Sequence, residues 1–147
     1  MVLAARTAGQ LADEILDLQR AVRCIALTGP RGDDMGVAHQ FVLRLVGEGE
    51  TRASRLAQRI GVGAPVLSRH ITNLEDRGYL VRKRDSHDGR VQLLAITTAG
   101  VERLRKIDRQ LATTLEEHLY DWSEQEASNT ARTLQKLTEA LKKEVRS

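Results

Sequence analysis

Residues 82–90, RKRDSHDGR, place cations and carboxylates close together in a short polar stretch. Arg84 and Arg90 flank its centre, His87 lies within it, and Asp88 lies two residues before Arg90. Side chains two residues apart in an extended chain share a face, so the Asp88 carboxylate can hold the Arg90 guanidinium in one rotamer. That restraint lowers the entropy lost when an arginine enters a narrow DNA groove. The competing interpretation is a surface ion pair worth under about 1 kcal/mol, and we favour the first.

A second set of polar residues lies shortly before this stretch, in APVLSRHITN (64–73). Its members are small, hydrogen-bonding or cationic, and they are Ala64, Pro65, Val66, Ser68, Arg69, His70, Thr72 and Asn73. Base edges in the major groove of DNA offer donors, acceptors and methyl groups that such side chains can contact. The alternative interpretation is a plain amphipathic surface helix, because a polar helical face alone is a weak signal.

Two short helices joined by a tight turn are predicted to position this polar face. Thr51 can cap the first helix, and Gly61 ends it. Pro65 suits the first turn of the second helix, and Gly78 follows its end. The residues expected to face inward are Leu56, Ile60, Leu67, Ile71 and Leu74. Helices paired in this way form a helix-turn-helix.

A charged hairpin is predicted to follow directly. Residues 80–84 and 91–96 have the apolar and β-branched content of strands, and DSHDGR joins them. A helix-turn-helix followed by a hairpin is a winged helix, and the tip of the wing can reach phosphates or an adjacent minor groove. The polar residues DSHDGR then form the wing tip.

Long apolar stripes lie on both sides of the winged helix. The helix that carries the first stripe is expected to end near residues 28–30. Ser123 and Glu126 match a capping box, which predicts the start of the last helix. A shorter apolar helix, over residues 37–46, is ended by GEGE at 47–50. The stripes are Leu11, Ile15, Leu18, Val22 and Ile25; Val101, Leu104, Ile107, Leu111, Leu115 and Leu119; and Ala127, Ala131, Leu134, Leu137, Leu141 and Val145. Helices of this kind pack naturally against copies of themselves, so we expect a two-fold dimer.

The fold class predicted from these elements is mainly α with a small β-hairpin wing, a winged helix-turn-helix plus a helical dimerisation domain. Residues 1–36 form the N-terminal helix and loop of the dimerisation domain. Residues 37–98 form the DNA-binding domain, and residues 99–147 form the C-terminal dimerisation helices.

Basic residues are concentrated in the same segment. Residues 51–90 carry nine Arg or Lys and four Asp or Glu, a local charge of +5 in a chain of 147 residues with net charge +3. A local basic excess favours a polyanion such as double-stranded DNA as partner. A nonspecific architectural DNA-binding protein would show the same excess, whereas a protein-interaction module would leave it unexplained.

Other classes of function lack support in the sequence. No nucleophile, base and orienting group occur at a spacing typical of an enzyme, and no histidine neighbours another histidine or a cysteine at metal-ligand spacing. We therefore expect no catalytic residues, no metal and no cofactor. The single cysteine, the absence of a 20-residue apolar run and the absence of a signal sequence indicate a cytoplasmic protein that does not enter membranes.

Two residues are weaker candidates for a ligand site. Cys24 could make the chain redox-responsive, although a lone helical cysteine is more typically a small core residue. His39, at the start of the short second helix, could line a pocket for a small-molecule effector or be an ordinary interface residue.

The segment from Val37 to Leu104 resembles the MarR family of bacterial transcriptional regulators. The resemblance is strongest in RLAQRIGVGAPVLSRHITNLEDRGYLVRKRD and in DSHDGRVQLLAITTAG. Asp88 and Arg90 match the D-x-R of the family's wing, and Ile96-Thr97 stands where the family has Leu-Thr. The flanking helices match in position and length but carry no motif.

This resemblance implies a homodimer that binds a pseudo-palindromic operator as a repressor and is released by a small lipophilic or phenolic compound. It places Arg90 in the minor groove with Asp88 orienting it. It assigns major-groove contacts to Ala64, Pro65, Val66, Ser68, Arg69 and His70.

Overall fold

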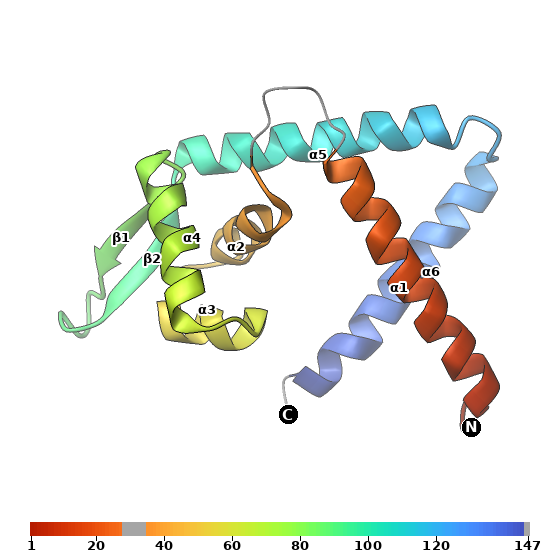
Figure 1. The fold of residues 1–147 in the computed structure, drawn as a ribbon, viewed down its shortest axis with the longest axis horizontal. Helices are drawn as coiled ribbons and strands as arrows, with labels where there is room; N and C mark the ends of the chain where they lie inside the picture. Colours follow the sequence, from red (N-terminus) through yellow and green to blue (C-terminus); the bar gives the residue numbers. More distant parts are fainter. Residues whose placement is uncertain (28–34, 146–147) are drawn as a thin grey trace. The chain divides into compact units, whose positions relative to one another are not determined.

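The computed structural model describes residues 1–27 and 35–145, which form six helices and one hairpin (Figure 1). In chain order these are α1 (Ala5–Leu27), α2 (Val37–Gly47), α3 (Ala53–Ile60), α4 (Ala64–Asp76), β1 (Leu80–Arg84), β2 (Gln92–Ile96), α5 (Thr98–His118) and α6 (Glu124–Val145). The predicted fold class, mainly α with a hairpin wing, is confirmed. The predicted stop of the first helix at residues 28–30 lies outside the described residues.

The core of the winged helix lies where α2, α3 and α4 meet the hairpin (Figure 1). The inward face of α4 is as predicted, and Leu56 of α3 is fully buried, while Ile60 packs half-buried against the same core. On α2, Phe41 is exposed, whereas Leu43 is fully buried. The largest fully buried side chains are Leu43, Leu56, Leu67, Ile71, Leu74, Leu80, Leu94, Val42 and Val46.

Two glycines end the helices of the helix-turn-helix as predicted. Gly61 has φ 73° and donates its N–H to the Ala57 carbonyl, which closes α3. Gly78 has φ 79° and donates to Glu75, while the next N–H, that of Tyr79, donates to Leu74. This pair of bonds is a Schellman motif, and its left-handed residue is costly for any side chain other than glycine.

The predicted cap at Thr51 is wrong. Arg52 occupies the N-cap of α3 and makes no side-chain cap bond. Thr51 instead pairs with Leu94 of β2 through both backbone groups, at 3.2 and 2.7 Å. A threonine is suited to extended pairing as well as to capping, and here the free edge of β2 supplies a partner. The segment before α3 is thereby fixed to the hairpin.

The hairpin is antiparallel, with Leu80 opposite Ile96 and Arg84 opposite Gln92. Val91 was predicted to begin the second strand, but it is the last residue of the loop, where its carbonyl accepts from the Asp85 N–H. The five-residue strands therefore join the wing tip directly to the buried base of the hairpin.

Thr97 joins the hairpin to α5. Its hydroxyl accepts the Gly100 N–H at 3.0 Å, as an N-cap does, and donates to the Gly78 carbonyl at 2.6 Å. Gly100 is buried, and a Cβ there would overlap the Tyr79 carbonyl and the Ile96 side chain. The start of α5 is thus held closely against the end of the helix-turn-helix.

Contacts divide the chain into Met1–Ala112 and Thr113–Ser147. In the second unit the predicted capping box is confirmed: Ser123 Oγ accepts the Glu126 N–H at 3.1 Å, and the Glu126 carboxylate accepts the Ser123 N–H at 3.0 Å. The predicted domain boundaries after residues 36 and 98 separate a DNA-binding domain from dimerisation helices and do not depend on contacts within the chain. They stay a prediction.

Candidate nucleic-acid interface

The outer face of α4 carries seven of the eight residues predicted to contact DNA bases. Leu67, Ile71 and Leu74 anchor the opposite face in the core, and a helix with a period of 3.6 residues then turns the intervening positions outward. The exposed residues are Ala64, Pro65, Val66, Ser68, Arg69, Thr72 and Asn73. The structure thus presents a broad exposed face of small, hydrogen-bonding and cationic groups.

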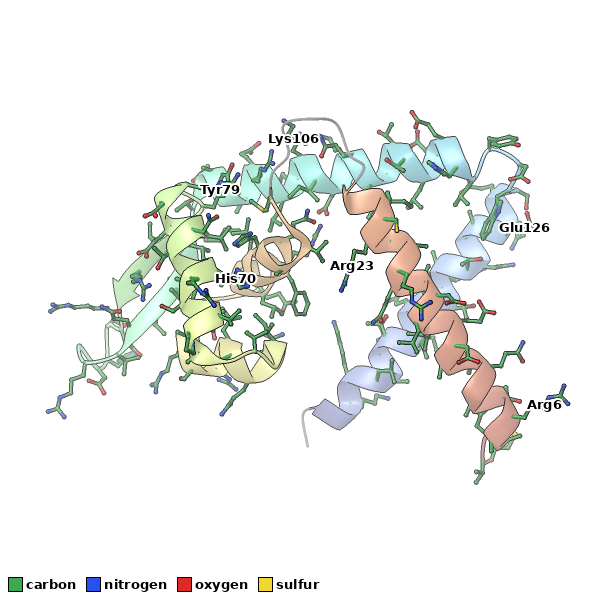
Figure 2. The ribbon with its side chains drawn as sticks, in the orientation of Figure 1. Arg6, Arg23, His70, Tyr79, Lys106 and Glu126 are labelled. Atoms are coloured by element: carbon green, nitrogen blue, oxygen red, sulfur yellow. The ribbon has the colours of Figure 1, made fainter. Side chains whose placement is uncertain are left out.

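His70 is the exception on this helix. It is half-buried on α4, where Figure 2 labels it. Its Nδ1 lies 3.1 Å from Nε2 of His39 on α2. The pair joins two residues that are 31 positions apart, so no local spacing could have predicted it. Because the imidazole of His70 is turned towards α2, it is less available to DNA than its neighbours Ser68 and Arg69.

The wing residues Arg84, His87, Asp88 and Arg90 are all exposed. The predicted pair between the Asp88 carboxylate and the Arg90 guanidinium is not formed, and Asp88 Oδ1 instead accepts the backbone N–H of Arg90 at 3.1 Å. Asp85 does the same for the N–H of His87, at 2.9 Å. These are Asx turns, in which a short carboxylate satisfies a backbone donor two residues on. The acids of the wing therefore shape its backbone and leave the Arg90 guanidinium unpaired among the described residues.

The cations of residues 51–90 fall into two groups. Three are neutralised: Arg59 by Glu48 at 3.1 Å, Arg82 by Glu75 at 3.1 Å and Lys83 by Glu50 at 3.2 Å. Another, Arg77, lies over the Tyr79 ring at 5.8 Å. The remaining five make no ion pair with any residue that the structure describes, and they are Arg52, Arg55, Arg69, Arg84 and Arg90. We call this set the unpaired arginines.

Two of the unpaired arginines, Arg52 and Arg55, were counted as charge in the sequence but not predicted as site residues. Both lie at the start of α3, which has no acid in its first turn. A signal existed for Arg55, since no acidic residue lies three or four positions from it to form a helical ion pair. Cations at a helix N-terminus oppose the helix dipole, but together with it they attract an anion.

The ion pair between Arg82 and Glu75 connects the wing to α4. Arg82 Nε lies 3.1 and 3.2 Å from the two Glu75 carboxylate oxygens, and both side chains are about one-third exposed. A pair this exposed contributes under about 1 kcal/mol. It is a side-chain link between β1 and the last turn of α4, added to the backbone turn at Gly78 and Tyr79.

The weaker ligand-site candidates differ in exposure. Cys24 is exposed on α1, whereas His39 is half-buried beside α4. A shallow groove lies between the end of α2 and the first half of α5, and neither residue lines it. Its lining consists of Arg44, Gly47, Glu48, Ile96, Val101, Leu104, Arg105 and Asp108.

Two further properties concern the described residues only. Over residues 1–27 and 35–145, no three or more His, Cys, Asp or Glu side chains are grouped so that they could hold a metal ion. In the same ranges, no helix has the length and apolarity that a membrane crossing needs.

Comparison with known proteins decides the family. The sequence model of the MarR family matches residues 34–91. The uncharacterized HTH-type transcriptional regulator YxaD of Bacillus subtilis is 32% identical over 102 residues, which are 69% of this chain and 71% of that protein. The chain belongs to the MarR family. It is therefore a transcriptional regulator and not an enzyme, as the sequence predicted.

Solved structures agree with the fold of this MarR-family chain. The transcriptional regulator BldR of Sulfolobus solfataricus has a TM-score of 0.74 at 21% identity, covering 97% of this chain and 99% of that one. FabT of Streptococcus pneumoniae, solved in complex with DNA, has a TM-score of 0.64 at 21% identity, covering 95% and 99%. The likeness extends over both flanking helical segments as well as the winged helix.

Proposed function

We propose that this MarR-family regulator binds double-stranded DNA through α4 and the wing, as a homodimer on a pseudo-palindromic operator. The observation that carries the proposal is the set of unpaired arginines, which lie at the start of α3 (Arg52 and Arg55), on α4 (Arg69) and on the hairpin (Arg84 and Arg90). Unpaired guanidinium groups gain by meeting phosphates, because no internal carboxylate must be given up. The complex of FabT with DNA supports this use of the shared fold.

Each element has a distinct part in the proposed complex. Ser68, Arg69 and Thr72 on α4 read base edges in the major groove. Arg90 enters the minor groove from the wing tip, with its loop backbone shaped by Asp88. Arg52 and Arg55 bind the phosphates that flank the major groove, and Arg84 binds those beside the wing.

The homodimer is supported by apolar residues that the single chain leaves uncovered. Leu11, Leu18 and Val22 form one helical stripe on α1, and all three are exposed, as is Leu16. On α6, Leu134 and Leu141 are exposed on the predicted stripe. Apolar rows on helices are costly in water, and packing against a second copy would cover the row on α1 and the row on α6.

The regulator acts as a repressor that a small lipophilic or phenolic ligand releases. The groove between α2 and α5 suits such a ligand, because the apolar Ile96, Val101 and Leu104 line it beside the Arg44 guanidinium. Arg44 is bound to Asp108 at 2.6 Å, so an acidic ligand would compete for it. With DNA as partner, the protein acts in the cytoplasm.

Selection of bound fragments from the DNA of the source genome, followed by titration of the enriched fragments, tests the proposal. We expect fragments that share a pseudo-palindrome, bound at least about 10³-fold more tightly than random duplex. Equal affinity for all duplexes, with a steep dependence on salt, would instead identify an architectural DNA-coating protein. Absence of any salt-dependent binding would leave a protein-interaction module.

A further inference from the structure

His39 and His70 bring two imidazole rings together between α2 and α4. Nε2 of His39 lies 3.1 Å from Nδ1 of His70, the ring centres are 4.6 Å apart, and the ring planes meet at 87°. Both side chains are half-buried, so water still reaches them. The proposed DNA interface and the groove between α2 and α5 make no use of this pair.

The rings do not meet end to end. In a linear N–H···N bond of 3.1 Å each ring would lie on the line of the bond, and the ring centres would be roughly 5.4 Å apart. The observed 4.6 Å requires at least one ring to tilt well away from that line. The two nitrogens are therefore closer to the side-by-side arrangement that two imidazoles adopt around a shared ion.

The spacing of the nitrogens suits such an ion. Zinc binds histidine nitrogen at about 2.0–2.1 Å, so an ion at that distance from two nitrogens 3.1 Å apart would subtend an angle of about 100°. That angle lies between the octahedral and tetrahedral values. Neutral imidazole prefers zinc, copper and nickel over magnesium or calcium, which require oxygen ligands.

We propose that His39 and His70 are a two-histidine site for a divalent transition-metal ion of the zinc type, with water completing the coordination. A site with two protein ligands and the remainder from water binds at modest affinity and in competition with protons. The bound ion joins α4 to α2, and it stabilises the winged helix because it binds the folded chain and not the separated helices. Nothing in this proposal requires the protein to bind DNA.

Calorimetric titration of zinc into the metal-free, full-length protein tests the proposal. We expect one site per chain in the wild type, weakened by more than about tenfold in His39→Gln and in His70→Gln, since losing a ligand costs at least as much as losing an outer-shell partner. The chain contains two further histidines that serve as matched controls, and His87→Gln and His118→Gln should bind zinc as the wild type does. Equal binding in all four variants, or none in the wild type, would overturn the proposal.

A second measurement needs no variant and so does not depend on how the variants fold. Nitrogen-15 NMR of the histidine rings in the wild type, with and without zinc, reports which ring nitrogen receives the ion. We expect the resonances of His39 Nε2 and His70 Nδ1 to shift together. Shifts confined to His87 or His118, or no shift, would show that the pair is only a hydrogen bond between helices.

Discussion

The α4 and α1 helices carry apolar stripes of the same period in very different surroundings. Leu67, Ile71 and Leu74 of α4 are at most 2% exposed, whereas Leu11, Leu18 and Val22 of α1 are 42–45% exposed. A periodic stripe shows that a helix will be covered on one side, but it does not show what covers it. For α4 the cover is the chain's own core, and for α1 we propose a second copy. This contrast leads to four predictions.

The largest effect is expected in the winged-helix core. Leu74→Ala should lower the free energy of unfolding by about 2–5 kcal/mol, because the fully buried side chain leaves a cavity that close-packed neighbours cannot fill. Urea denaturation followed by circular dichroism measures the loss. Val66→Ala, at an exposed position of the same helix, is the control, and equal losses in both variants would mean that Leu74 is not a core residue.

The next effect separates the subunits without unfolding the winged helix. Leu18→Asp should raise the dissociation constant of the dimer about 100-fold, or roughly 3 kcal/mol, because it buries a charge in the proposed interface. Analytical ultracentrifugation over a dilution series measures it. Val81→Asp changes an equally exposed apolar residue on β1 and should leave the dimer unchanged. If Leu18→Asp dimerises as the wild type does, α1 is not the interface.

The third effect is on DNA and not on stability. Arg90→Ala should weaken operator binding by about 1–3 kcal/mol and leave the dimer intact, since it removes an unpaired guanidinium from the wing tip. Fluorescence anisotropy with labelled operator measures it. Arg59→Ala removes an arginine already bound to Glu48 and is expected to cost much less. Wild-type affinity in Arg90→Ala would remove the wing from the mechanism.

The smallest effect compares one ion pair from each region. A double-mutant cycle on Arg82 and Glu75 should give a coupling under about 1 kcal/mol, because both groups are partly exposed. The more exposed pair of Arg20 and Asp17, within α1, should give at most about 0.5 kcal/mol. Stability in urea is the measurement for both cycles. A larger coupling in α1 would contradict the expectation that the less exposed pair is the stronger one.

Features set by neighbouring residues could be predicted from the sequence. Gly61 and Gly78 were placed correctly because a left-handed residue at a helix end nearly requires glycine, and Ser123 because a capping box lies within four residues. The exposed residues of α4 followed from its buried stripe in the same way. The fold class and the location of the candidate interface therefore needed no contact between distant residues.

Features that depend on distant partners could not be predicted. Thr51 was predicted to cap α3, because its pairing with Leu94 joins residues far apart in the sequence and could not be seen there. The link between His39 and His70 has the same origin. The prediction for Asp88 was wrong for a different reason. A carboxylate two residues before Arg90 can bind either the Arg90 side chain or the Arg90 backbone N–H, and the tight turn of the wing favours the backbone N–H.

Hydroxyl-radical footprinting of the wild-type protein on its selected operator tests the central claim most directly. If two paired subunits each present α4 and a wing, the protected regions should form two half-sites about 10–10.5 base pairs apart, or a multiple of this. Within each half-site, protection of the minor groove beside the wing should disappear in Arg90→Ala. A single protected half-site, or uniform protection along the duplex, would contradict the account.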